Sequence, residues 1–264
     1  MSAEIKTSSP SNPSSNVYPI TYTFRIFRGN DKTGEFVNYK VPVDEGMVVL
    51  DAILSIQENQ DTELAVRWNC KSGRCGSCGM EVNGMPKLAC MARLSDFDPA
   101  IPITVTPMKT FPVLKDLVSD VSWNYEVNKT IQPFSPDENS DFTFQQEDIE
   151  RSREFRKCIE CFLCQDVCHV IREHDKKDSF AGPRFFVRSA ALHFHPKDTA
   201  DRKEWLQEGQ GGIGHCNITR CCTDVCPEHI NITDNAIIPQ KEYVVDNYYS
   251  IYSILGWIKK QFNK

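Results

Sequence analysis

The amino-acid sequence predicts an α+β protein in which a small β-rich domain precedes an all-α domain. Its 264 residues are enough for two compact domains. In the first half, the apolar residues Tyr22, Phe24 and Ile26 alternate with polar ones, which is typical of a half-buried strand. Beyond about residue 140, strand signals fade and helical patterns replace them. This change of pattern predicts two domains of different class.

The first half begins with residues 1–18, a polar leader rich in Ser and Pro that we expect to be disordered and that lacks the apolar segment of a signal peptide. The β-rich domain is predicted to span residues 19–120. Its predicted elements, in chain order, are a strand at Tyr22–Ile26, a turn at Gly29–Asp31, a strand at Glu35–Val43, a helix at Val48–Ile56 and a strand at Ile103–Thr106.

The second half is predicted to be helical after a connector. Residues 121–142, rich in Asn, Asp and Ser, are predicted to connect the domains, and residues 143–264 to form the helical domain. Thr143, with Gln146 three residues on, predicts a capping box at the first helix. The predicted helices are residues 145–156, 184–192 and 234–243.

The C-terminal stretch, residues 246–264, is rich in Tyr, Ile and Trp and carries Lys259 and Lys260 after most of its aromatic residues. One interpretation is an amphipathic tail that touches a membrane surface or a partner subunit. The other is a terminal helix that covers the core, since the aromatic residues spread around the helix and do not form one stripe.

Composition excludes several classes of function. The net charge of −6 and the lack of a Lys/Arg block interleaved with aromatics argue against nucleic acid as a partner. No stretch approaches the roughly 20 apolar residues that span a bilayer. Twelve cysteines without an export signal indicate metal binding in a reducing compartment and argue against disulfides.

The first group of cysteines predicts a [2Fe–2S] cluster. Cys70, Cys75 and Cys78 follow the spacing C-x4-C-x2-C, the plant-type pattern, and Cys90 follows after eleven intervening residues. Glycines between these cysteines allow the backbone to approach the cluster sulfides closely. A structural zinc site is the alternative, but zinc favours paired C-x2-C knuckles and only one such pair is present.

The second and third groups predict two further clusters. The second group, C-x2-C-x2-C-x3-C, follows the bacterial ferredoxin pattern, in which the fourth cysteine ligates the other cluster. The third group repeats this spacing, with Thr219 in the second cysteine position and Pro227 at its end. The predicted ligands are Cys158, Cys161, Cys164 and Cys226 for [4Fe–4S], and Cys168, Cys216 and Cys222 for a cluster that is one thiolate short.

Thr219 makes the third cluster unusual. A hydroxyl is a poor substitute for a soft thiolate, and the iron that lacks a thiolate is the one most easily lost. The sequence therefore predicts [3Fe–4S] at this site, with all the cluster ligands provided by eleven of the twelve cysteines. Cys221 leaves an alternative open, because it could supply the missing ligand and give [4Fe–4S]; otherwise it is a small buried residue.

The three predicted clusters indicate an electron relay. The sequence contains no G-x-G-x-x-G, Walker A or nucleophile-elbow motif, and so no catalytic residue is predicted on this chain. Each cluster of this kind accepts one electron, at a potential set by cluster type, charge and hydrogen bonds to sulfur.

The order of these motifs resembles the iron–sulfur subunits of succinate dehydrogenase and fumarate reductase along almost the whole chain. The resemblance rests on Arg67–Cys70, Cys75–Gly79, Leu88–Cys90, Phe111–Leu117, Cys158–Cys168, Gly182–Pro183 and Cys222–Pro227. It implies a β-grasp, plant-type ferredoxin-like N-terminal domain and a helical, bacterial-ferredoxin-like C-terminal domain. It also implies a flavoprotein partner with covalent FAD that oxidises succinate, and a membrane-anchor cytochrome subunit with quinone near the [3Fe–4S] cluster. The expected location is then peripheral, on the cytoplasmic face of a bacterial inner membrane.

The chain departs from the family pattern near the third cluster. His169 follows Cys168 where many members have proline, Glu173 stands where a tryptophan would fall, and Asn217 replaces a common histidine. The quinone-site residues therefore do not transfer, and the run Cys161–His169 looks more like the menaquinone-using branch. His169 and His215 either donate a hydrogen bond near the cluster or are partly exposed histidines at helix ends.

Alternatives to a succinate dehydrogenase subunit remain at this point. The same chemistry run in reverse would make the chain a fumarate reductase subunit. A soluble multi-cluster relay for another oxidoreductase, or a zinc-stabilised scaffold, would also use clustered cysteines.

Overall fold

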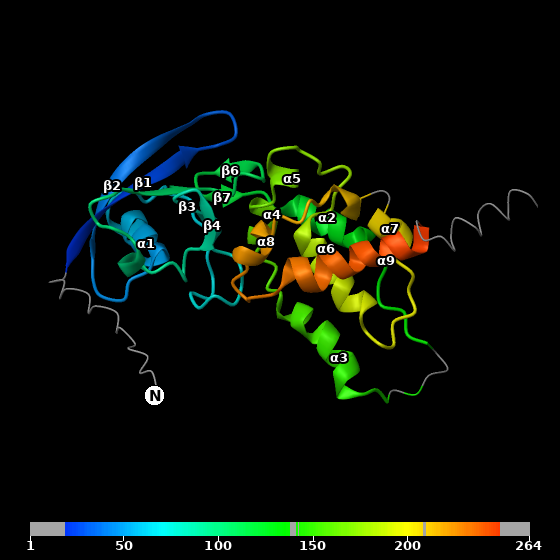
Figure 1. The fold of residues 1–264 in the computed structure, drawn as a ribbon. Helices are drawn as coiled ribbons and strands as arrows, with labels where there is room; N and C mark the ends of the chain where they lie inside the picture. Colours follow the sequence, from blue (N-terminus) through cyan, green and yellow to red (C-terminus); the bar gives the residue numbers. More distant parts are fainter. Residues whose placement is uncertain (1–18, 138–140, 142, 208–209, 249–264) are drawn as a thin grey trace, which may run out of the picture.

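The computed structural model describes residues 19–137, 141, 143–207 and 210–248, in which a five-stranded sheet is followed by a helical region (Figure 1). The strands of the sheet lie in the order β2-β1-β5-β3-β4. Their bounds are β1 Ile20–Gly29, β2 Gly34–Val43, β3 Gly79–Val82, β4 Met85–Leu88 and β5 Ile103–Thr106. β1 is antiparallel to β2 and parallel to β5, whereas β3 is antiparallel to both β5 and β4.

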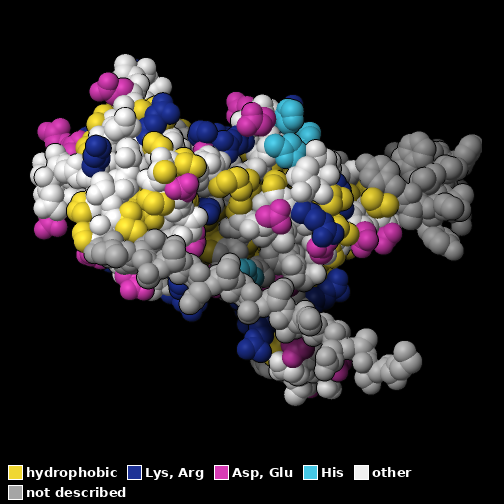
Figure 2. All heavy atoms as spheres, turned by 60° about the vertical axis from the view of Figure 1, so that its left-hand side comes forward, with side chains coloured by type: hydrophobic (Ala, Val, Ile, Leu, Met, Phe, Trp, Pro, Cys, Tyr) yellow, Lys and Arg dark blue, Asp and Glu magenta, His cyan; other side chains and the backbone are white. Residues whose placement is uncertain are grey.

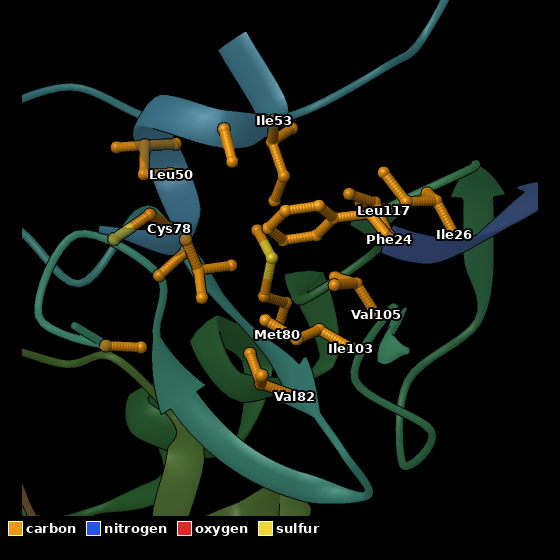
Figure 3. Close-up of a cluster of buried hydrophobic side chains, with 14 of the residues drawn as sticks. Phe24, Ile26, Leu50, Ile53, Cys78, Met80, Val82, Ile103, Val105 and Leu117 are labelled. Atoms are coloured by element: carbon orange, nitrogen blue, oxygen red, sulfur yellow. The ribbon is translucent and has the colours of Figure 1, made fainter. Parts of the chain in front are cut away.

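The core of this sheet lies under helix α1 (Val49–Asn59) (Figures 1 and 3). The alternation in β1 buries Phe24 and Ile26 completely, and Ile53 from α1 is equally buried. In Figure 3, Cys78 lies at the edge of the same apolar cluster, near Leu50. The predicted strands and helix of residues 20–59 and the strand at Ile103–Thr106 are thus confirmed, and the core holds one side of the first cysteine group.

The β3–β4 hairpin was not predicted from the sequence. Val82 pairs with Met85 across a two-residue loop, and Asn83 and Gly84 both have positive φ, at 51° and 77°. Asn-Gly is the residue pair that a type I′ hairpin turn prefers, because both residues tolerate this conformation. The short apolar run before this turn directly follows the cysteines of the first group, so it does not stand out as a strand in the sequence.

The segment after the sheet is ordered and contains secondary structure. β6 (Val113–Lys115) pairs with β7 (Val118–Ser119), and helix α2 (Ser122–Thr130) occupies the start of the predicted connector. Trp123 packs edge-on against Phe185, with ring centroids 6.3 Å apart. The connector therefore begins as a helix packed on the helical region.

The helical region consists mainly of short elements, and its three predicted helices are confirmed. The α-helices are α3 Gln146–Arg153, α4 Leu163–Asp166, α5 His169–Arg172, α6 Pro183–His193, α7 Lys203–Gln207, α8 Cys221–Asp224 and α9 Ile238–Tyr248. Other helical turns are η1 Leu94–Asp96 in the first half, η2 Glu154–Lys157, η3 Ile213–His215 and the π-helical η4 Ile232–Ile237. The predicted capping box is wrong: α3 begins at Gln146, and the Thr143 hydroxyl donates to Asp141 instead.

Two hydrophobic cores meet within the second cysteine group. Cys161, Phe162 and Leu163 belong to the core of the sheet, whereas Cys164 and Cys168 belong to the core of the helical region. Across the same boundary, the buried carboxylate of Glu81 on β3 accepts contacts from Lys109 at 3.0 Å and from Arg172 of α5 at 2.9 Å. The two regions are therefore joined by both apolar and ionic contacts.

The face shown in Figure 2 carries acidic and basic side chains side by side, with small groups of hydrophobic side chains between them. Large apolar residues that are exposed include Trp68, by 43%, and Met91, by 58%. The predictions for residues 1–18 and for the aromatic-rich tail after residue 248 lie outside the described residues.

Candidate iron–sulfur centres

In the first cysteine group, backbone N–H groups of the loop point towards the sulfur atoms of the cysteines. Ser72 and Arg74 donate their N–H groups to Cys70 Sγ at 3.4 and 3.3 Å, and Gly73 donates to Cys90 Sγ at 3.3 Å. Gly73 has a φ of 69°, a left-handed conformation that glycine adopts without steric cost. Such a nest of N–H donors suits anionic sulfur, as a [2Fe–2S] site requires.

The hairpin brings the remaining two cysteines of this group together. Gly79 pairs with Leu88, so Cys78 and Cys90 lie at the open end of β3 and β4. Ala89 N–H also donates to the Cys78 carbonyl at 3.0 Å. The Asn-Gly turn therefore positions two of the predicted ligands, and it was the signal in the sequence that could have identified the hairpin.

Two thiols of the first group, Cys70 and Cys78, differ in their electrostatic environment. Backbone N–H bonds from Ser72 and Arg74 lower the pKa of Cys70 to about 6. Burial raises the pKa of Cys78 to about 12. Cys70 thus favours the thiolate before any metal is present, whereas Cys78 needs the positive charge of iron to ionise.

Cys158, Cys161, Cys164 and Cys226 line one cavity, although Cys226 lies 62 or more residues beyond the others in the chain. Arg184, Val187 and Ile230 complete part of the lining. A cubane needs four thiolates around one volume, so this donor set fits a [4Fe–4S] cluster. Burial raises the pKa values of both Cys161 and Cys164 above the usual thiol value, with the neighbouring thiols adding to the effect.

The second and third cysteine groups share an unusual backbone pattern. Glu160 and Phe162 have positive φ, two and four residues after Cys158, and Ile218 and Arg220 have it at the same offsets after Cys216. Each run then enters a four-residue helix, α4 or α8, and these two helices pack together. Thr219 therefore occupies the loop position that Cys161 occupies in the other run.

The third group gathers around Cys222. Cys168 interacts electrostatically with Cys221 and Cys222, and Cys222 interacts with Cys216. Cys168 and Cys222 are buried, whereas Cys216 is partly exposed. The three predicted ligands are thus brought together by segments about 50 residues apart, and three thiolates fit a cluster that lacks one iron.

Thr219 and Cys221 lie beside each other at the edge of this group. The Thr219 hydroxyl and Cys221 Sγ are 3.3 Å apart, within hydrogen-bonding distance. Cys221 is partly exposed, so its description as a small buried residue is wrong.

The histidines next to the third group make ring contacts. The rings of His169 and His174 pack edge-on at 6.1 Å, and the His215 ring contacts Phe180 at 6.4 Å.

The zinc alternative requires several donors to converge on one point. In the part of the chain that the structure describes, no group of three or more His, Cys, Asp or Glu side chains is placed to hold a single metal ion. The cysteines of the second group instead enclose a cavity. Among the same residues, none of the helices has the length and apolar character needed to cross a membrane.

Comparisons with domain families agree with this arrangement. The model of the 2Fe-2S iron-sulfur cluster binding domain matches residues 23–126, and that of the 4Fe-4S dicluster domain matches residues 154–230. The fold and the three cysteine groups therefore define an iron–sulfur protein with a plant-type ferredoxin-like domain and a helical dicluster domain. This confirms the predicted fold class.

Comparisons with whole proteins identify the family. The fumarate reductase iron-sulfur subunit of Mycobacterium tuberculosis is 32% identical, over 74% of this chain and 81% of that protein. The mitochondrial succinate dehydrogenase [ubiquinone] iron-sulfur subunit of Candida glabrata is 30% identical, over 81% and 87%. A chain of the solved Mycobacterium smegmatis Sdh1 complex in the apo form matches with a TM-score of 0.85 and 53% identity, over 88% of this chain and 99% of that one. The chain belongs to the iron–sulfur subunits of the succinate dehydrogenase and fumarate reductase family.

Family membership confirms the predicted class of cofactor and function. The chain is an iron–sulfur subunit of an oxidoreductase complex, and the two domain models name the [2Fe–2S] and [4Fe–4S] types. The third cluster of the family, [3Fe–4S], agrees with the three-cysteine set around Cys222. The assignment of each cysteine to its cluster stays a prediction.

Proposed function

We propose that this chain relays electrons in a membrane-bound succinate:quinone oxidoreductase, from FAD in a flavoprotein subunit to quinone at a membrane-anchor cytochrome subunit. The observation that carries the proposal is that successive cysteine groups touch. A Cβ placed on Gly76, inside the first group, would lie 2.7 Å from Cys161 Cα in the second. Cys164 in turn interacts electrostatically with Cys222 in the third. The three cysteine groups therefore follow one another in space, as a relay needs.

The proposed ligands are those that the spacings predict. They are Cys70, Cys75, Cys78 and Cys90 for [2Fe–2S], Cys158, Cys161, Cys164 and Cys226 for [4Fe–4S], and Cys168, Cys216 and Cys222 for [3Fe–4S]. When bound, the clusters supply one-electron redox centres. The proposal includes the division into residues 19–120, 121–142 and 143–264.

Exposed side chains beside the first and third cysteine groups support the entry and exit of electrons at these two groups. Trp68 and Met91 are exposed apolar side chains beside the first group, where the flavoprotein subunit would dock. Residues 217–220 are exposed in the third group and include Ile218, which is 40% exposed, where the anchor subunit would dock. Cys161 and Cys164 between them are buried. The proposal includes a peripheral location of the subunit, on the cytoplasmic face of the membrane.

The test is to purify the complex from membranes and to compare its air-oxidised and chemically reduced forms by electron paramagnetic resonance (EPR). We expect an FAD-bearing chain to co-purify, a [3Fe–4S] signal in the oxidised complex, and [2Fe–2S] and [4Fe–4S] signals in the reduced one. A chain that purifies with iron and sulfide but without any flavoprotein would indicate a relay for another oxidoreductase. Zinc without acid-labile sulfide would contradict the redox role altogether.

Thr219 allows a direct test of the third cluster. Thr219→Cys should replace the [3Fe–4S] signal of the air-oxidised complex with a [4Fe–4S] signal in the reduced one, because it restores the fourth thiolate. The matched variant Cys221→Ala should leave the [3Fe–4S] signal unchanged. Loss of the third cluster's signal in Cys221→Ala, or no [3Fe–4S] signal in the unmodified complex, would assign Cys221 as a ligand.

A second candidate function is fumarate reduction by the same relay in the reverse direction. It is favoured by the names of relatives such as the fumarate reductase iron-sulfur subunits of Mycobacterium tuberculosis and Haemophilus influenzae, the latter 28% identical over 88% of this chain and 96% of that protein. Measuring succinate oxidation and fumarate reduction in the same membranes separates the two directions.

A further inference from the structure

Arg184 is a buried cation in the wall of the cavity that Cys158, Cys161, Cys164 and Cys226 line. Its side chain is 4% exposed, although arginine is rarely buried without a partner that explains it. It is the second residue of α6, which begins with Pro183 after Gly182. The family resemblance rests on Gly182 and Pro183, and neither it nor the spacing of the cysteines assigns a role to the residue that follows.

Contacts with other residues fix both the backbone and the guanidinium group of Arg184. Its backbone N–H donates to Gln165 Oε1 at 3.2 Å, and Gln165 is itself completely buried. Its Nη2 forms an ion pair with Glu160, whose carboxylate is half exposed. These contacts come from residues adjacent to Cys164 and Cys161, so the position of the guanidinium is tied to that of the two thiols.

One donor of Arg184 is left over. Nε is buried and has no hydrogen-bond partner among the described residues. A buried N–H without an acceptor has lost its hydration without compensation, which is most unfavourable when the group is charged, so such groups normally have a partner. The cavity that Arg184 borders would contain sulfur acceptors once a cluster is bound.

We propose that Arg184 Nε donates a hydrogen bond to a sulfur of the [4Fe–4S] cluster and thereby raises its reduction potential, while Glu160 limits the effect. The inference rests on the proposed ligand set of this cavity. A cation and a donated hydrogen bond both stabilise the additional negative charge of the reduced state. Val187, Ile230 and Ile232 are at most 2% exposed and keep water from the same wall, which strengthens the interaction.

The first measurement is an EPR redox titration of the whole complex. Arg184→Gln should shift the reduction equilibrium of the [4Fe–4S] cluster about tenfold towards the oxidised state, which is about 59 mV for one electron. Glu160→Gln should shift it in the opposite direction, because the carboxylate no longer offsets the guanidinium. The matched control is Arg188→Gln, on the same helix and exposed, which should leave the potential unchanged.

The second measurement detects the bond itself. In complex labelled with ¹⁵N-arginine, pulsed EPR of the reduced [4Fe–4S] cluster should show a nitrogen coupling that disappears in Arg184→Gln and remains in Arg188→Gln. Arg184→Lys retains the charge and loses Nε. It should therefore lose the coupling but keep part of the rise in reduction potential that Arg184 produces.

The outcomes distinguish this proposal from the function it rests on. A [4Fe–4S] signal whose potential and nitrogen coupling are the same in Arg184→Gln and Arg188→Gln overturns the role of Arg184 alone. Loss of the cluster in both Arg184→Gln and Arg184→Lys, measured as iron and acid-labile sulfide, also overturns it and assigns Arg184 to holding the fold. Absence of a [4Fe–4S] signal from the unmodified complex would instead overturn the proposed function.

Discussion

The first cysteine group and the two groups in the helical region are held in place by different kinds of structure. The first group is contained in one segment, residues 70–90, and rests on a sheet that has its own apolar core. In the helical region, Cys164, Cys168 and Cys222 are themselves core residues. The helices α4 and α8, which contain Cys164 and Cys222, and α5, which begins directly after Cys168, have four residues each. Helices this short are not stable alone.

This difference teaches which part of the molecule needs its clusters in order to fold. In the sheet region, strand pairing and Phe24, Ile26 and Ile53 form a core whether or not iron is bound. In the helical region, the proposed clusters would fill part of the core and link residues 158–168 to residues 216–226. Binding free energy is then folding free energy, as in small metal-dependent domains.

The largest expected effect is therefore from removing iron. Chelation under reducing conditions should leave slow amide hydrogen exchange in β1 and β5, and should abolish protection in residues 164–172 and 221–226. Structural zinc sites, in which binding is likewise coupled to folding, contribute on the order of 10 kcal/mol. Hydrogen exchange read by mass spectrometry before and after chelation makes the measurement. Equal loss of protection in both regions would contradict the comparison, and re-adding iron and sulfide is the control.

Glu81 tests how strongly the two regions are coupled. Its carboxylate is completely buried and contacts Lys109 and Arg172, so Glu81→Gln should lower the free energy of unfolding by roughly 3 kcal/mol, because the partner cations lose their counter-charge. Urea unfolding of the cluster-loaded protein gives this number. Glu35→Gln, an exposed carboxylate on β2 of the same sheet, should change it by less than about 0.5 kcal/mol. Similar losses in the two variants would show that the ionic contact is unimportant.

Gly76 tests the contact between the first and second cysteine groups. Gly76→Ala places a Cβ against the backbone of Cys161, so the two loops must move apart, whereas Gly73→Ala meets only the Met91 side chain. Both glycines have nearly the same φ, 70° and 69°, so the conformational cost, about 1–2 kcal/mol, is shared.

The measurement for this pair is magnetic. Gly76→Ala should weaken the spin–spin interaction between the reduced [2Fe–2S] and [4Fe–4S] clusters, seen in the microwave power needed to saturate the [2Fe–2S] signal. Gly73→Ala should leave that interaction as it is in the unmodified complex. An equal effect of both variants would mean that loop strain, and not the contact with Cys161, sets the distance.

Much of the sheet could be predicted from the sequence because its signals are local. The alternation at Tyr22, Phe24 and Ile26 and the Asn83-Gly84 pair depend only on neighbouring residues, although the second was overlooked. The thiol sets could be proposed from spacing alone, because a cubane ligand set with a crossing cysteine is restrictive. The contact of Gly76 with Cys161 and the burial of Glu81 could not, since both depend on how two cores meet.

The helical region shows the limit of such prediction more clearly. Arg184 carries no signal in its own segment, since its burial and its unpaired Nε depend on Gln165, Glu160 and Cys226, which lie far from it in the sequence. The capping box at Thr143 failed for a local reason instead. Asp141, an upstream neighbour, competes for the hydroxyl.

The smallest expected effect separates the two regions by their response to acid. All six histidines lie after residue 168, so the sheet region has none. Burial, with the charge of Arg202 adding to it, lowers the pKa of His193, whose ring packs on Tyr243 at 4.5 Å. Asp198 and Asp201 act in the opposite direction but do not reverse the shift, and Arg151 adds to it.

The sign of the pH dependence follows from this lowered pKa. Below about pH 6.5 the unfolded chain binds a proton at residue 193 that the folded chain resists, so stability falls as the pH drops through that window and is complete above it. His193→Gln should flatten this part of the profile, measured as urea midpoints of the loaded protein between pH 6 and 7.5, and the exposed His174→Gln is the matched control. If the unmodified protein and His193→Gln lost the same stability across this range, the buried histidine would play no part in the acid sensitivity of the helical region.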